Sequence, residues 1–148
     1  MAQHVHETMA KFGYPDTAVS DYAHWAVLVR VKQVTLGSLV LVCKEPAEAF
    51  SEVSRAALTE LHDVTSDLES ALSDAFSFDR INYLMLMMVD PHVHFHVIPR
   101  YAAPRELDGE RFEDDAWPGP PDLKRARDLD ARERERLIAL LRDRWPKR

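Results

Sequence analysis

Three histidines at every second position, His92, His94 and His96, interrupt an otherwise apolar run with the order His-Val-His-Phe-His-Val-Ile. Side chains of a β-strand alternate between its two faces, so this spacing predicts a strand with three imidazoles on one face. The other face, which carries Val93 and Phe95, is suited to pack against a core. Such a strand requires a sheet with an apolar layer on one side and a polar site on the other.

The clustering of these three imidazole rings indicates a functional site. Three of the seven histidines fall within five residues, and burying a polar ring without a partner costs about 1 to 3 kcal/mol. A solvated strand face would more naturally carry Thr, Lys or Glu. Imidazole is a common transition-metal ligand and also a nucleophile or acid–base group near neutral pH. From the residues alone, a metal site and a covalent catalytic site therefore both stay open.

The triad run, followed by Pro99 and Arg100, resembles the signature of the histidine triad (HIT) superfamily of nucleotide hydrolases and transferases. It is similar to the dinucleoside polyphosphate hydrolase branch of that superfamily. A hairpin over residues 27–42 with Gly37 at its turn, then a long helix and two strands, is similar to the HIT core order over residues 20–101. The resemblance implies an α+β fold with an antiparallel sheet of about five strands, a long helix packed on it and a C-terminal helix.

The length and the hydrophobic pattern fit one HIT-like domain over residues 1–148, with 46 % hydrophobic residues for its core. An apolar stripe with three- and four-residue spacing predicts the long helix, from an N-cap at Ser54 to about Phe76. Residues 81–89 are almost continuously apolar, which predicts a central strand covered on both faces.

The two ends of the chain differ from this core. Residues 102–128 are rich in proline and charge and predict a long loop, and a capping box starts a C-terminal helix over residues 129–146. A short helix is expected before Gly13, whereas His4 and His6 are expected in a disordered tail.

Composition limits the partners and the location. The net charge of −6 and the lack of basic clusters argue against a nucleic-acid partner. No apolar run is long enough to span a membrane and no signal peptide is recognisable, so we expect no membrane partner and a cytoplasmic location. The single Cys43, within an apolar strand, is expected to be a buried thiol.

The resemblance assigns roles to the triad. It implies that His94, the middle histidine, forms a nucleotidyl-histidine intermediate that water then releases, while His92 and His96 contact phosphate oxygens and assist the leaving group. One imidazole nitrogen attacks while the other donates to a backbone carbonyl. The resemblance implies no metal for the covalent step, with Mg²⁺ accompanying a polyphosphate substrate. It also implies a nucleotide as the small-molecule partner and a homodimer.

Five further side chains are candidates for substrate binding. Arg100 and Arg30 are the cations expected near phosphate, and Ser38 follows the hairpin glycine where HIT proteins often carry a histidine. Asn82 lies on the strand expected beside the triad. Asp90 is either a general acid or imidazolium partner, or a simple Asp-Pro turn residue.

Two other functions remain as alternatives to a hydrolase or transferase. One is a nucleotide-binding module that keeps the HIT fold and turns over little substrate. The other is a metalloenzyme in which two or three of the imidazoles, with Asp90, hold a divalent ion.

Overall fold

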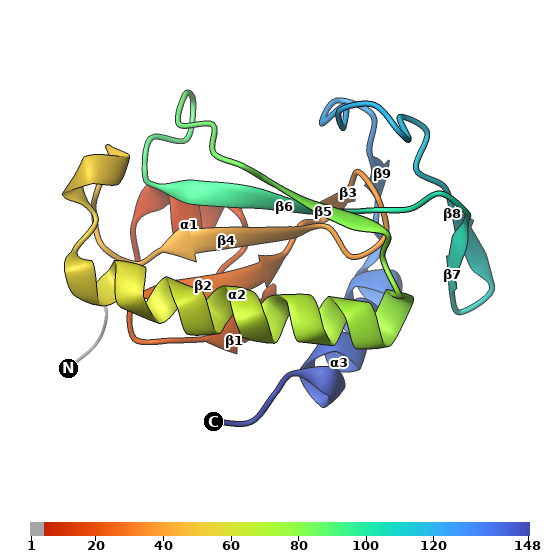
Figure 1. Ribbon diagram of the computed structural model, residues 1–148, viewed down its shortest axis with the longest axis horizontal. Coiled ribbons are helices and arrows are strands. Elements are labelled where there is room, and N and C mark those ends of the chain that lie inside the picture. Colours follow the sequence, from red (N-terminus) through yellow and green to blue (C-terminus); the bar gives the residue numbers. More distant parts are fainter. Residues whose placement is uncertain (1–4) are drawn as a thin grey trace.

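The computed structural model describes residues 5–148, and His4 lies outside the described residues. The helices are arranged around one central sheet (Figure 1). The elements are α1 (Glu7–Lys11), β1 (Ala18–Asp21), β2 (Trp25–Val29), β3 (Lys32–Gln33), β4 (Leu39–Cys43), the 3-10 turn η1 (Phe50–Glu52), α2 (Arg55–Phe76), β5 (Arg80–Leu84), β6 (His94–Arg100), β7 (Arg105–Leu107), β8 (Glu110–Phe112), β9 (Arg127–Asp128) and α3 (Ala131–Arg144).

The central sheet has five antiparallel strands in the order β1-β2-β4-β6-β5. The hairpin of β2 and β4 is the predicted one, and its turn contains Gly37 with φ +92°. A Cβ at this glycine would approach Leu72 to 3.0 Å, so both the backbone and the packing of α2 favour glycine there. With the long α2 and the C-terminal α3, this architecture is the α+β fold that the sequence predicts.

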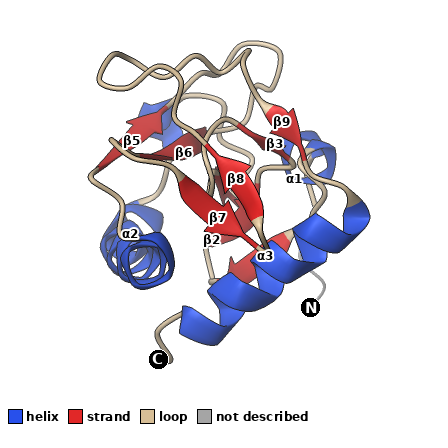
Figure 2. Cartoon of the chain, turned by 90° about the vertical axis from the view of Figure 1, so that its right-hand side faces the viewer, coloured by secondary structure: helices blue, strands red, loops and turns tan. Residues whose placement is uncertain are grey.

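The two faces of the sheet are covered differently. Helix α2 packs on one face, where α3 contacts both α2 and β1, and these elements enclose the larger apolar core (Figure 2). The short helix α1 lies on the opposite face (Figure 1), over a smaller apolar cluster that includes Met9, Leu28 and Val40. The triad side chains face this second, thinner layer, because Phe12 next to α1 contacts the rings of both His94 and His96.

Local signals place the two long helices correctly. The hydroxyl of Ser54 accepts a hydrogen bond from the backbone N–H of Ala57, so α2 begins where the N-cap is predicted. At α3, the side chain of Asp130 accepts from the N–H of Glu133, and the Glu133 carboxylate accepts from the N–H of Asp130. This reciprocal pair is the predicted capping box.

The apolar run 81–89 does not form a central strand. Only Arg80–Leu84 is extended, as β5, and β5 lies at an edge of the sheet. Beyond it the chain leaves the sheet, and Met88 and Val89 are 84 % and 86 % exposed. An apolar composition alone does not show whether a second strand is available to pair, which is why the prediction was wrong.

Residues 102–128, expected to be a loop, contain short strands. β7 and β8 form a hairpin around Asp108 and Gly109, both with positive φ. β9 pairs with β3, so the chain leading into α3 is attached to the hairpin that follows β2. This pairing brings the start of α3 to the same side of the sheet as α1 (Figure 2). Within residues 5–148, no helix is long and apolar enough to cross a membrane.

Candidate active site

Strand β6 positions the second and third histidines of the triad. His94 and His96 lie opposite Val42 and Val40 of β4, in the interior of the sheet. His92 precedes the strand, which begins at His94 and not at His92 as the spacing predicts. The backbone at His92 is therefore free of the sheet ladder, and its carbonyl can accept a hydrogen bond from a side chain.

The carbonyl of His92 accepts that bond from His94. The His94 Nδ1 atom lies 2.7 Å from the His92 carbonyl oxygen. A carbonyl oxygen only accepts, so Nδ1 must carry a hydrogen. In the neutral ring the lone pair then belongs to Nε2, the nitrogen that can attack an electrophile. This Nε2 is a buried side-chain atom without a hydrogen-bond partner in the described part of the chain.

The His94 ring is fully buried in this arrangement. The Phe12 ring covers it from the α1 side, with 5.7 Å between ring centroids, and also lies 5.8 Å from the ring of His96. Leaving a buried polar nitrogen unpaired costs free energy. An unpaired group at such a position is typical of functional sites, where a ligand or a movement supplies the partner.

His96 is held neutral. Arg30 Nε lies 3.3 Å from His96 Nδ1 and donates to it, so Nε2 carries the hydrogen of the neutral ring. Burial, and after it the positive charges of Arg30 and His94, lower the pKa of His96 to about 4. At neutral pH His96 therefore offers a hydrogen-bond donor and not a proton.

His92 is oriented by the N-terminal segment. Its ring stacks on His6, with 4.0 Å between centroids and 14° between planes, and its Nδ1 lies 3.0 Å from the Thr8 hydroxyl. His6 is buried, caps α1 through Met9 N–H, and lies 2.7 Å from the carbonyl of Cys43. The expectation of a disordered tail is therefore wrong for His6, because the residue is fixed between α1 and β4.

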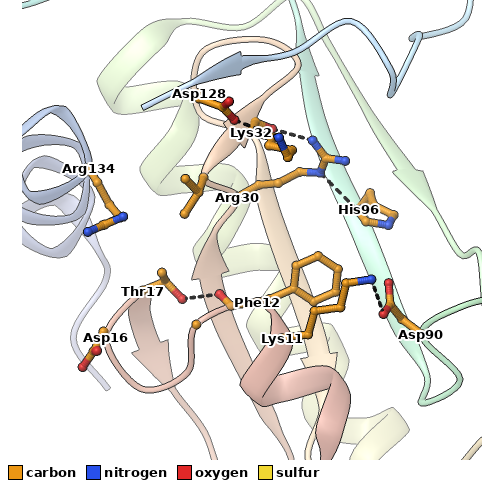
Figure 3. Close-up of a pocket in the computed structure, with 12 residues that line it drawn as sticks. Lys11, Phe12, Asp16, Thr17, Arg30, Lys32, Asp90, His96, Asp128 and Arg134 are labelled. Atoms are coloured by element: carbon orange, nitrogen blue, oxygen red, sulfur yellow. Dashed lines mark hydrogen bonds and ion pairs between the residues drawn. The ribbon is translucent and has the colours of Figure 1, made fainter. Parts of the chain in front are cut away.

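A cavity of about 630 Å³ opens beside the triad (Figure 3). This volume is typical of small-ligand sites. His96 is the triad member that lines it, and Phe12 forms part of the wall that separates it from His94. Most of the other lining side chains are charged. The lining residues are Lys11, Phe12, Gly13, Asp16, Thr17, Arg30, Val31, Lys32, Asp90, His96, Asp128 and Arg134.

The predicted binding residues divide into two groups. Asp90 lines the cavity, where its carboxylate lies 2.6 Å from Lys11 Nζ (Figure 3). The Ser38 hydroxyl is buried and bonds the backbone of Thr35 within its own turn. Arg100, at the far end of β6, is buried and donates to Asn82. The structure therefore brings Asp90 to the triad but not Ser38, Asn82 or Arg100.

Arg100 is occupied by a different partner. Its guanidinium forms two hydrogen bonds, of 2.7 and 3.1 Å, with the carboxylate of Asp114, and a third of 2.8 Å with the carbonyl of Gly119. Both side chains of this ion pair are about 95 % buried or more. The pair holds the 102–128 segment against the sheet, which gives Arg100 a structural contact away from the cavity.

The Nδ1 atoms of the three triad histidines each have a separate partner. The Nδ1 atoms of His92, His94 and His96 contact Thr8, the His92 carbonyl and Arg30 respectively. Across residues 5–148, no three His, Cys, Asp or Glu side chains are arranged to hold a metal ion.

Comparisons with known proteins identify the family of the chain. Residues 12–103 match the HIT domain family. The chain belongs to the HIT family. The matched region includes all three triad histidines, β1 to β6 and α2. Among proteins with curated functions, none matches the chain.

Several solved structures share this HIT fold. A histidine triad protein from Bradyrhizobium japonicum is 23 % identical, with 98 % of this chain and 99 % of that chain covered and a TM-score of 0.75. A HIT protein from Sinorhizobium meliloti 1021 is 18 % identical, with 95 % and 96 % covered and a TM-score of 0.74. A zinc-bound histidine triad family protein from Mycobacterium smegmatis is less similar, with 15 % identity, 84 % and 83 % covered and a TM-score of 0.54.

Sequence reasoning missed the contribution of the two ends of the chain. The α1 segment covers the triad, and the cavity also takes Asp128 and Arg134 from the C-terminal segment. One signal for α1 was present, since Met9 and Phe12 have the three-residue spacing of a buried helix face. No local pattern marks Arg134 as different from the other arginines at the start of α3.

Proposed function

We propose that this HIT protein is a nucleotide hydrolase or nucleotidyl transferase that cleaves a P–O–P or P–N bond through a covalent nucleotide on His94. The observation that carries the proposal is the 2.7 Å hydrogen bond from His94 Nδ1 to the His92 carbonyl. It fixes the tautomer in which Nε2 holds the lone pair, the state that a nucleophilic imidazole requires. Dinucleoside polyphosphates are the first substrates of this class to test.

The residues have distinct roles in this reaction. Nε2 of His94 attacks the phosphorus of the nucleoside monophosphate unit and forms a P–N bond. The bond from phosphorus to the leaving group breaks, and the leaving group keeps the electron pair. The Nε2–H of His96 donates to a phosphate oxygen, and this stabilises the negative charge in the transition state. His92, which His6 and Thr8 hold in place, assists the leaving group. Water then cleaves the P–N bond and restores His94.

The reaction requires α1 to move. His94 is fully buried and Phe12 separates it from the cavity. α1 is short, and it is held over the triad by the packing of Met9 on the sheet, by the contact of Thr8 with His92 and by the ion pair between Lys11 and Asp90. Displacement of Phe12 would join the cavity to Nε2, and the arrangement described here is therefore the closed state.

The test is covalent labelling with a dinucleoside polyphosphate that carries radioactive α-phosphate. We expect an acid-labile nucleotide on the protein after a rapid quench, and none on His94→Asn. The matched control is His62→Asn, which changes an exposed histidine on α2 and should label like the unchanged protein. Label that survives His94→Asn, or no turnover of any dinucleotide, phosphoramidate or aminoacyl adenylate, would contradict the proposal.

A nucleotide-binding module with little turnover is the second candidate. The observation that favours it is the burial of His94, because a nucleophile that substrate rarely reaches turns over slowly. Calorimetry that shows tight binding of a nucleoside monophosphate, without any product from dinucleotides over the same period, would select this function.

The remaining parts of the proposal concern the cofactor, the assembly and the location. The covalent step uses no metal, and Mg²⁺ enters only with a polyphosphate substrate. A His-ligated metalloenzyme is the alternative. Elemental analysis of untagged protein decides between the two, because stoichiometric zinc would contradict the metal-free mechanism.

We further propose a homodimer, which sedimentation equilibrium tests against the 17.0 kDa protomer, and a cytoplasmic location.

A further inference from the structure

The ring of His92 is held by two side chains of the N-terminal segment. The His6 ring stacks on it, with 4.0 Å between centroids and 14° between planes. The Thr8 hydroxyl oxygen lies 3.0 Å from His92 Nδ1 and 3.4 Å from the backbone nitrogen of the same histidine. Thr8 is 1 % exposed and His6 is 4 % exposed. The first histidine of the triad is therefore in contact with a buried part of the α1 segment.

The hydrogen bonds of Thr8 decide which nitrogen of His92 carries a hydrogen. The backbone N–H of His92 can only donate, so the Thr8 oxygen accepts in that bond. The hydroxyl has one hydrogen of its own, and a buried hydroxyl without an acceptor is costly. Within residues 5–148, the one further atom that is hydrogen-bonded to this hydroxyl is His92 Nδ1. Thr8 therefore donates to Nδ1, and the neutral His92 ring carries its hydrogen on Nε2.

The His6 ring is itself fixed at both nitrogens. Its Nε2 lies 2.7 Å from the Cys43 carbonyl oxygen, which only accepts, so Nε2 carries a hydrogen. Its Nδ1 accepts a hydrogen bond of 3.3 Å from the backbone N–H of Met9, so Nδ1 holds a lone pair. His6 is thus a neutral ring in a fixed orientation. A stacked ring of this kind limits rotation of the His92 ring.

The three triad rings consequently present different groups at Nε2. His94 offers a lone pair, whereas His96 and His92 each offer an N–H. His92 is half-buried, and its Nε2 forms no hydrogen bond in the described part of the chain. The N–H of His92 is therefore available to a ligand.

The residues that hold His92 lie outside the region that defines the family. Thr8 and His6 precede residues 12–103, the part of the chain that matches the HIT domain. Thr8 reaches His92 across 84 positions of sequence because α1 packs on the sheet. The support of His92 is therefore a contribution of the N-terminal segment of this chain.

We propose that Thr8 is a positioning residue for His92, whose tautomer it fixes so that Nε2–H donates a hydrogen bond to the leaving oxygen of a P–O–P substrate. The leaving oxygen rests on the proposed function, whereas the tautomer does not. His92 transfers no proton in this step. Its N–H stabilises the negative charge that the leaving oxygen gains as its bond to phosphorus breaks. Phe12, which must be displaced, follows the exposed end of α1, so the buried first turn can keep its contact with His92.

The first test reads the tautomer without catalysis. Two-bond ¹H–¹⁵N correlation spectra of the full-length protein, recorded at about pH 8 so that the rings are neutral, distinguish protonated from unprotonated ring nitrogens. Comparison with His92→Gln assigns the His92 signals. We expect a hydrogen on Nε2 in the unchanged protein and in Thr8→Ser, which keeps the hydroxyl. In Thr8→Val both tautomers become populated, so the two nitrogen signals of His92 should move toward each other.

The matched control for Thr8→Val is Thr65→Val. The Thr65 hydroxyl bonds only backbone carbonyls of its own helix, α2. Its removal should leave the His92 signals unchanged.

The second test measures the rate at which labelled nucleotide is transferred to His94. For a dinucleoside polyphosphate, Thr8→Val should slow the transfer about fivefold, the effect of one lost hydrogen bond, and Thr8→Ser should restore it. For the p-nitrophenyl ester of a nucleoside monophosphate, the leaving oxygen shares its charge with the aromatic ring and needs less stabilisation. The change there should be less than about twofold. Thr65→Val should change neither rate.

The outcomes separate this role of Thr8 from the proposed function. A hydrogen on His92 Nδ1 in the unchanged protein overturns the inference, as do identical His92 signals in the unchanged protein and in Thr8→Val. Equal slowing with both substrates also overturns it, because a general loss of structure acts on both. If the tautomer responds to Thr8→Val in a protein that forms no nucleotide adduct on His94, the positioning of His92 stands and only the covalent mechanism is contradicted.

Discussion

At the scale of single residues, the two histidines of β6 differ through their partners. His94 donates to the carbonyl of His92 and keeps a lone pair on the buried Nε2. His96 accepts from Arg30 and keeps a hydrogen on Nε2. Two neighbouring imidazoles on one strand face thus present different groups at Nε2, a lone pair on His94 and an N–H on His96, because different groups lie against their Nδ1 atoms.

The pKa of His96 predicts a pH dependence of stability. The pKa of His96 is about 4 in the native protein, against a usual 6.5. Between these two pH values the histidine is therefore protonated in the unfolded chain but not in the native protein. The contribution of His96 to the free energy of unfolding is therefore fully present above pH 6.5, and it is lost as the pH falls toward 4. Between pH 7 and pH 5 the loss is about 2 kcal/mol, from the linkage of the two pKa values.

Urea unfolding of the unchanged protein and of His96→Gln at pH 7 and pH 5 measures this loss. Glutamine does not titrate, so the fall in the free energy of unfolding should be about 2 kcal/mol smaller in the variant. An identical fall in both proteins would show that His96 is not held neutral by its surroundings.

At the scale of elements, the α1 segment covers the triad. It has five residues and buries only Thr8 and Met9, so its own stability is low, and the packing of Met9 on β2 and β4 and the contact of Thr8 with His92 hold it in place. Its neighbour Phe12 lies against His94 and His96 and also lines the cavity. A small element that covers a reactive side chain is suited to local opening without unfolding of the sheet.

Removal of the Phe12 ring should expose His94. In Phe12→Ala, we expect diethyl pyrocarbonate to modify His94 several-fold faster than in the unchanged protein, as measured by peptide mass spectrometry. The control is Phe50→Ala, which removes an exposed ring from η1 and should leave the rate unchanged. If His94 of the unchanged protein already reacts as fast as the exposed His62, α1 does not cover the triad in solution.

At the scale of the whole molecule, the segment after the triad strand completes the cavity. Arg100 and Asp114 anchor residues 102–128 to the sheet, and the pairing of β3 with β9 then places the start of α3 beside the cavity. Arg136 and Asp108 add an exposed ion pair between α3 and the turn after β7. The buried pair matters most, because neither of its charges can be solvated if the other is removed.

Asp114→Ala should therefore destabilise the protein by about 3 to 5 kcal/mol, the usual cost of leaving a buried charge unpaired. Chemical unfolding measures the change. Asp115→Ala is the matched control, because Asp115 is exposed and pairs with the exposed Arg125, and its removal should cost about 0.5 kcal/mol or less. Similar losses in both variants would contradict the role of Asp114 as an anchor.

The amino-acid sequence alone determined the features that depend on neighbours a few residues apart. The N-cap at Ser54, the capping box at Asp130 and Glu133, and the β2–β4 hairpin were predicted correctly, because caps, periodicity and turns act over short spans. The triad motif likewise indicated the α+β fold and the HIT family without any knowledge of distant contacts.

Only the tertiary structure decided which side chains meet. Thr8 and His92 lie 84 positions apart in the chain, and their contact depends on how α1 packs against the sheet. The edge position of β5, the burial of Arg100 and the approach of Arg134 to the cavity depend in the same way on which surfaces pair. Such contacts are fixed by burial and pairing across the whole molecule, so no local sequence pattern encodes them.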